Sequence, residues 1–171
     1  MLIDISELLS VNGKNVEISV DIEMQRYVSR MCDYEIVKKK PLLIRLHNTG
    51  KRAFMLETTV DITLLMQCGR CLENVEHNLQ FNVKKEIDMN ESDEEKDELF
   101  YISDDKLDIE KLVYNEILVN LPMKVLCSEN CKGICNRCGA NLNSQTCNCD
   151  TTELDPRMSK IRDIFNNFKE V

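Results

Sequence analysis

Two neighbouring segments of the chain alternate between apolar and polar residues. Every second residue of 54–66 is apolar except Thr58, and the same alternation returns in residues 75–83. A period of two is typical of a β-strand with one buried face. Only a short connection containing Cys68 and Cys71 separates the two segments. The sequence therefore predicts a long antiparallel hairpin with these two cysteines at its tip.

Shorter elements are predicted on the N-terminal side of this hairpin. Residues 42–47 have the pattern of a strand, and residues 48–52 have the composition of a turn. Nearer the N-terminus, the turn-forming residues 12–15 separate two short pieces that are either extended or helical. We therefore expect an antiparallel sheet built around the hairpin.

Two helices are predicted after the hairpin. Asp108 can cap the first, and Pro122 ends it. Asp155 and Pro156 supply the cap and first turn of the second. Each has an apolar side, made of Ile109, Leu112, Val113, Ile117 and Leu121 in the first, and of Met158, Ile161, Ile164, Phe165 and Phe168 in the second.

Nine cysteines add a chemical signal to this pattern. Cys135 and Cys138 form a CxxC pair followed by glycine, a spacing with which a tight turn directs two sulfurs at one ion. Cys147 and Cys149 lie nearest in sequence, and loop-closure entropy favours them as the other two ligands. Because no export signal is apparent, we expect reduced thiols and a structural zinc site, with an iron–sulfur cluster as the main alternative.

The remaining paired cysteines form a second candidate site, made of Cys68, Cys71, Cys127 and Cys131. The wider spacing of the last two leaves open that they are only partly buried thiols beside the first site. Cys68 and Cys71 also have the spacing of a redox dithiol, for which Arg70 would lower a thiolate pKa. Such dithiols stand at the start of a helix, whereas a strand is predicted after Cys71, so the metal interpretation is favoured.

Together these features predict an α+β fold: an antiparallel sheet with a long hairpin, packed by helices, plus a C-terminal cysteine-rich zinc module. We expect residues 1–121 to form the sheet domain and its following helix, and residues 122–171 to form the zinc module and C-terminal helix. Within the first unit, residues 88–104 contain an acidic run without apolar residues, which predicts a mobile, solvated loop.

Charge restricts the partners of the protein. There are 22 Lys and Arg against 30 Asp and Glu, a net charge of −8, which disfavours a general nucleic-acid coat. Any RNA contact must therefore be local. The candidates are basic residues of the sheet half that would form one face: Lys38, Lys39, Lys40, Lys51, Arg52, Arg70, Lys84 and Lys85.

The sequence contains no arrangement typical of an enzyme. Phosphate-binding glycine loops and nucleophile elbows are absent, and four-cysteine sites leave no open metal position. His47 and His77 lie on predicted strands, and Cys32 is interpreted as a buried apolar side chain. An acidic N-terminus and the lack of a long apolar run indicate a cytoplasmic protein without membrane contact or small-molecule substrate.

Three stretches resemble the large ribosomal RNA subunit accumulation proteins, the YceD-like family of bacteria and plastids. They are residues 68–73 (CGRCLE), residues 121–143 with the following Cys147-Asn-Cys149, and Asp155-Pro-Arg157. The resemblance implies a non-enzymatic factor needed for accumulation of large-subunit (23S) rRNA in 50S assembly or precursor processing. Its partner would be that rRNA or a pre-50S particle, reached directly or through a ribosomal protein.

Two other functions fit the same cysteines. The first is a redox-switched zinc chaperone that releases its metal on oxidation and binds unfolded proteins. The second is a zinc-ribbon interaction module in transcription, suggested by the long hairpin tipped with CxxC.

Overall fold

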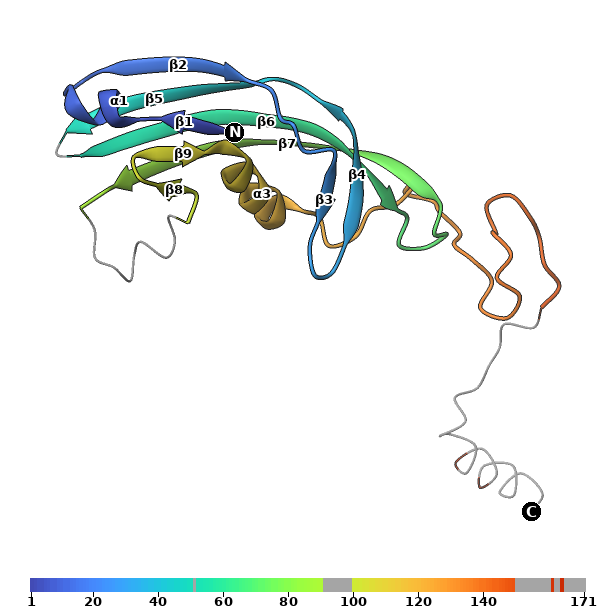
Figure 1. The fold of residues 1–171 in the computed structure, drawn as a ribbon. Coiled ribbons are helices and arrows are strands. Elements are labelled where there is room, and N and C mark those ends of the chain that lie inside the picture. Colours follow the sequence, from blue (N-terminus) through green and yellow to red (C-terminus); the bar gives the residue numbers. More distant parts are fainter. Residues whose placement is uncertain (51, 91–99, 150–160, 162–163, 165–171) are drawn as a thin grey trace.

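The computed structural model describes residues 1–50, 52–90, 100–149, 161 and 164 (Figure 1). Its main feature is a six-stranded antiparallel sheet. Five strands follow one another across it in the order β2 (Asn15–Val20), β5 (Leu42–Gly50), β6 (Ala53–Gln67), β4 (Asp33–Lys39) and β3 (Arg26–Val28), and β7 (Asn74–Asp88) pairs with β6.

The predicted hairpin is confirmed as β6 and β7. Each strand has 15 residues, and they pair from Ala53 opposite Asp88 to Gln67 opposite Asn74 without a bulge. On its other edge, β6 pairs first with β5 and then with β4. The sheet is therefore organised around β6, and the hairpin tip extends beyond the other strands.

The elements on the N-terminal side were predicted in part. Residues 42–47 lie in β5, and the turn predicted at 12–15 lies between α1 (Ser6–Ser10) and β2, which begins at Asn15. Strands β3 and β4 are not predicted by the sequence pattern, because their apolar positions are few and β3 has only three residues. Tyr27 of β3 is nevertheless fully buried, and its ring lies 4.8 Å from that of Tyr114.

One face of the sheet, which we call the inner face, is covered. A small sheet lies against it with α1 and α3 (Ile109–Asn120), and its strands are β1 (Leu2–Asp4), β9 (Lys106–Asp108) and β8 (Ile102–Ser103) (Figure 1). The even-numbered residues of β6, such as Phe54 and Leu64, are buried there, whereas most odd-numbered residues face the opposite, outer face.

Helix α3 confirms the first predicted helix. The carboxylate of Asp108 accepts a hydrogen bond from the backbone amide of Lys111 at 3.4 Å and so caps the helix. Its predicted apolar stripe is buried except for the half-buried Leu121. Glu116 fixes the helix to the sheet through an ion pair with Lys85 of β7 at 2.6 Å.

Two predicted segments fall largely outside the described residues. Of the predicted loop 88–104, residues 91–99 are not described, but Tyr101 is buried and β8 follows it. Of the predicted C-terminal helix, only Ile161 and Ile164 are described, and both are helical and exposed. The described fold is thus dominated by antiparallel sheet, with few helices. No described helix is long and apolar enough to cross a bilayer.

Candidate metal centre

The hairpin tip holds Cys68 and Cys71 in one tight loop. The amide of Cys68 donates to the carbonyl of Glu73 at 2.8 Å, and the amide of Leu72 donates to the carbonyl of Cys68 at 3.0 Å. Leu72 has a left-handed backbone, with φ of 62°, which reverses the chain immediately after the second cysteine. Both cysteine side chains are buried as a result.

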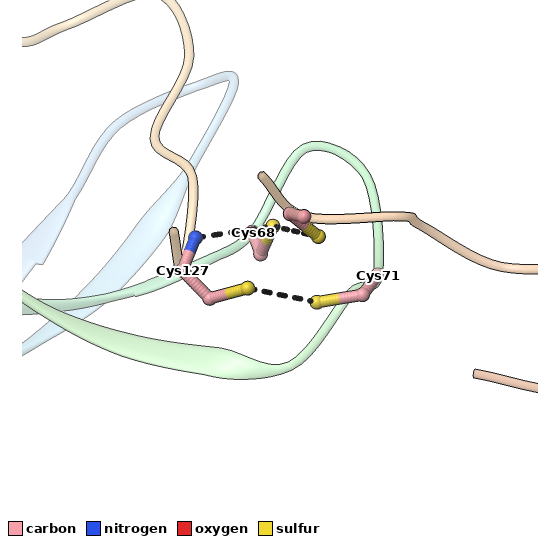
Figure 2. A group of neighbouring side chains, drawn as sticks. Cys68, Cys71 and Cys127 are labelled. Atoms are coloured by element: carbon pink, nitrogen blue, oxygen red, sulfur yellow. Dashed lines mark hydrogen bonds between the residues drawn. The ribbon is translucent and has the colours of Figure 1, made fainter. Parts of the chain in front are cut away.

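The chain that follows α3 returns to this tip. The amide of Gly69 donates to the carbonyl of Val125 at 2.8 Å, which places Cys127 beside Cys68 (Figure 2). Arg70 then holds the next turn, because its guanidinium donates to the carbonyl of Cys131 at 3.0 Å. Four cysteines from two distant segments thereby meet, and we call Cys68, Cys71, Cys127 and Cys131 the hairpin cluster.

The sulfur positions of the hairpin cluster fit a tetrahedral metal ion. The sulfurs of Cys68 and Cys131 lie 3.8 Å apart, those of Cys71 and Cys127 lie 3.5 Å apart, and all four lie within 4.8 Å of one another. A zinc ion with bonds of about 2.3 Å to four sulfurs would space them about 3.8 Å apart. The same contacts are far longer than the roughly 2.0 Å bond of a disulfide.

The remaining four cysteines form a second group, the C-terminal cluster, made of Cys135, Cys138, Cys147 and Cys149. A turn brings the first two together. The amide of Gly139 donates to the carbonyl of Cys135 at 2.9 Å, and the amide of Cys135 donates to the carbonyl of Ala140 at 2.9 Å. Gly139 has φ of 72°, so the glycine after the CxxC serves the turn. The four sulfurs again lie within 4.8 Å of one another.

The thiol pKa values within each cluster are pulled apart. Hydrogen bonds from the backbone amides of Cys71, Arg70 and Cys127 lower the pKa of the Cys68 thiol to about 6. Hydrogen bonds from the backbone amides of Cys138 and Arg137 lower the pKa of the Cys135 thiol to about 6. The thiol of Cys138, together with burial, raises the pKa of Cys149 to about 12. Within a cluster the thiols thus differ in acidity, and a bound cation would favour the anionic form of all four sulfurs.

Asn141 and Asn143 support the clusters, a role that the sequence pattern does not predict. The Asn143 side chain donates to the sulfur of Cys131 at 3.3 Å and lowers the pKa of that thiol. The Asn141 side chain donates to the carboxylate of Glu73 at 2.7 Å, which joins the C-terminal segment to the hairpin tip. Asparagines are common in loops, so nothing in the local sequence distinguishes these two.

The described basic candidates do not form the single face that was predicted from the sequence. Adjacent residues of a strand point to opposite faces. Lys84 lies on the outer face, paired with Glu57 at 2.8 Å, whereas Lys85 lies on the inner face, paired with Glu116. The same alternation separates Lys38 from its neighbour Lys39, whose cross-strand partner Ile62 is buried.

The other basic candidates that the structure describes are also held by acceptors. Lys51 lies outside the described residues. The contacts are Lys38 with Glu76, Lys39 with the carbonyl of Met24, Lys40 with Asp61, Arg52 with Asp105, and Arg70 with the carbonyls of Glu129 and Cys131.

The remaining single candidates have ordinary surroundings. The half-buried Cys32 has its sulfur 3.0 Å from the hydroxyl of Ser29. His47 is exposed on the outer face, and its ring contacts the amide oxygen of Asn15. His77 is half-buried on the inner side of β7.

Comparison with known proteins identifies relatives of this chain. Residues 56–165 match the model of the family described as "Large ribosomal RNA subunit accumulation protein YceD". The uncharacterized protein YlbN of Bacillus subtilis is 26% identical over 114 residues, which cover 66% of each chain. An uncharacterized protein of Mycobacterium tuberculosis is 29% identical over 111 residues, 63% of this chain and 53% of its own.

A plant relative has a more informative name. The chloroplastic "Large ribosomal RNA subunit accumulation protein YCED homolog 1" of Arabidopsis thaliana is 36% identical over 50 residues, 29% of this chain and 16% of its own. The chain spans about half the length of the mycobacterial relatives it matches. No solved structure matches it.

Proposed function

Since the chain belongs to the YceD family of large ribosomal RNA subunit accumulation proteins, we propose that it is a non-enzymatic cytoplasmic factor for 23S rRNA accumulation during 50S assembly. The observation that carries the proposal is the family match over residues 56–165, which include most of the hairpin and both cysteine clusters. Its partner is the large-subunit rRNA or a pre-50S particle, contacted directly or through a ribosomal protein.

The proposal includes one structural zinc ion in each cluster. In each cluster, four sulfurs within 4.8 Å of one another supply a complete ligand set and leave no open position for a reacting water. A bound zinc would hold the cluster's thiolates together and contribute folding free energy. The residues of the hairpin cluster would then fasten the C-terminal segment to the sheet, because they come from both parts of the chain.

Metal analysis of the purified, reduced protein tests the zinc sites. We expect two zinc ions per chain. Cys71→Ser and Cys138→Ser should each lose one, whereas the control Cys32→Ser should keep both because Cys32 belongs to neither cluster. Stoichiometric iron, or no metal, would contradict this part of the proposal.

Deletion in the host tests the assembly role. Loss of the protein should lower mature large-subunit rRNA relative to small-subunit rRNA. The wild-type protein and Cys32→Ser should restore the ratio, and Cys138→Ser should not. A ratio that is unchanged by deletion, including in the cold, would count against the role.

Two binding measurements separate the proposal from its alternatives. An assembly factor should co-sediment with large-subunit precursors, whereas a transcription module would co-purify with RNA polymerase. Retention of zinc under mild peroxide is expected of a structural site, and its release with gain of client binding would instead support a redox-switched chaperone.

A further inference from the structure

Strand β7 forms a long edge of the sheet. One side of β7 pairs with β6 over all 15 residues, and no described strand pairs with its other side (Figure 1). The strands at the remaining borders are much shorter, with six residues in β2 and three in β3. β7 therefore presents the longest row of unpaired backbone groups in the described sheet.

The central part of this edge, residues 77–83, lacks the features that usually prevent strand pairing, and the inward-pointing charge of β7, Lys85, lies outside it and is paired with Glu116. Such edges are commonly interrupted by proline, a bulge or inward-pointing charges. β7 contains no proline and no bulge, and residues 77–83 carry no Lys, Arg, Asp or Glu. The edge is therefore suited to accept another strand.

The sequence of β7 is complementary to itself. In an antiparallel pairing that sets Gln80 opposite Gln80 of a second copy, Glu76 faces Lys84 twice, once on each side of the two-fold axis. Asn78 then faces Asn82, which are both amides. On the inner side the opposing pairs are Val75 with Lys85, His77 with Val83, and Leu79 with Phe81.

Other registers lose this complementarity. A shift by two residues puts Glu76 opposite Asn82 in one direction and opposite Glu86 in the other. A shift by one residue would pair outer-face side chains with inner-face ones, because strand side chains alternate. Among these registers, the arrangement about Gln80 is the one that places Glu76 opposite Lys84.

Glu76 and Lys84 are available for these contacts. Glu76 pairs with Lys38 at 2.7 Å and Lys84 pairs with Glu57 at 2.8 Å, but the side chains of Glu76 and Lys84 remain 50% and 66% exposed. A second copy would extend each pair into a row of alternating charges across the outer face. Attraction of this kind is local, which matters because the net charge of −8 disfavours association at longer range.

A second exposed feature lies beside the same edge. Val119 is 73% exposed and follows Glu116 by three residues on α3, so both belong to one side of the helix. Glu116 contacts Lys85 of β7, and Val119 therefore lies on the β7 side of α3. An exposed apolar side chain therefore lies beside the edge that a second copy would extend.

We propose that this chain forms a symmetric dimer by antiparallel pairing of β7 with β7 of a second copy about Gln80, which continues the sheet across the two subunits. The proposal is independent of the function proposed above.

A charge-swap experiment on the full, metal-loaded chain tests the dimer. Sedimentation equilibrium of the wild type should give twice the chain mass of 19.9 kDa. Glu76→Lys and Lys84→Glu each set like charges opposite at both symmetric positions, and should weaken dimerisation roughly ten-fold or more. An equimolar mixture of the two variants should dimerise again, because each then supplies the charge that the other lacks.

The mixture is also the control for folding. Each variant loses its own intramolecular ion pair with Lys38 or Glu57, and mixing does not restore that pair. Recovery of the dimer on mixing therefore reports contacts between copies alone. A wild-type protein that stays monomeric up to roughly 100 μM would overturn the proposal. It would also be overturned by single variants that dimerise like the wild type, or by a mixture that stays monomeric.

Discussion

Two glycines beside the cysteine clusters share a left-handed backbone but differ in their surroundings. Gly133 has φ of 77°, and a Cβ atom added there would lie 3.1 Å from the carbonyl oxygen of Arg70. That oxygen accepts the hydrogen bond from Ile134 that joins the C-terminal segment to the hairpin tip. Gly139 has φ of 72°, and no atom lies within 4 Å of its added Cβ.

Substitution of each of these two glycines by alanine gives a matched test of the effect of one added methyl group. Both Gly133→Ala and Gly139→Ala should cost about 1 kcal/mol from the left-handed backbone. Gly133→Ala should cost more, because the methyl group also presses against the Arg70 carbonyl. Zinc transfer to a competing chelator should therefore be faster for Gly133→Ala than for Gly139→Ala. Equal rates would show that the contact with Arg70 does not matter.

At the scale of the element, α3 depends on the residue that immediately precedes it. Asp108 caps the helix and also lies 3.5 Å from the ammonium of Lys111 and 3.8 Å from the N-terminal amino group. Asp108→Ala should lower the free energy of unfolding by about 1 kcal/mol, as cap removal generally does. Asp108→Asn keeps an acceptor for the capping bond and should cost less. Urea denaturation measures the free energy of unfolding of both variants. Equal losses in the two variants would show that the charge of Asp108, rather than the capping bond, stabilises the helix.

At the scale of the whole molecule, the hydrophobic contacts fall into two groups. The larger fills the space between the main sheet, the small sheet and the helices, and the smaller surrounds Cys68, Cys71 and Cys131. Chelation of zinc should therefore loosen the cysteine-rich segment and leave the sheet folded. Amide hydrogen exchange should rise in residues 126–149 and stay slow in β5 and β6. Cooperative loss of protection in both regions would contradict this division.

The distribution of basic residues sets a second expectation at this scale. The described candidates lie on different faces and are paired with carboxylates or carbonyls, so they provide no concentrated basic surface. Reversal of Lys51 and Arg52 to glutamate should change binding to large-subunit precursor particles by no more than about two-fold, with a shallow salt dependence. If binding of the wild type depended steeply on salt and the double reversal abolished this dependence, Lys51 and Arg52 would instead be shown to contact phosphates.

The local pattern of the sequence determined the elements that depend on near neighbours. The hairpin was predictable because a period of two over many residues fits one half-buried strand pair and because its connection is short. Helix α3 was predictable from its cap, its apolar stripe and its terminating proline. The grouping of Cys135 and Cys138 with Cys147 and Cys149 followed from the low entropy cost of closing a short loop.

Only the tertiary structure decided which distant groups meet. The sequence left the role of Cys127 and Cys131 open, and the return of the chain after α3 brings them to Cys68 and Cys71. Asn143 gained its contact with Cys131 in the same way. The prediction of a single basic face was wrong because adjacent residues of a strand point to opposite faces of the sheet, so closeness in sequence does not place two lysines on one face. Local preferences act over a few residues, whereas a site built from separated segments depends on how the whole chain packs.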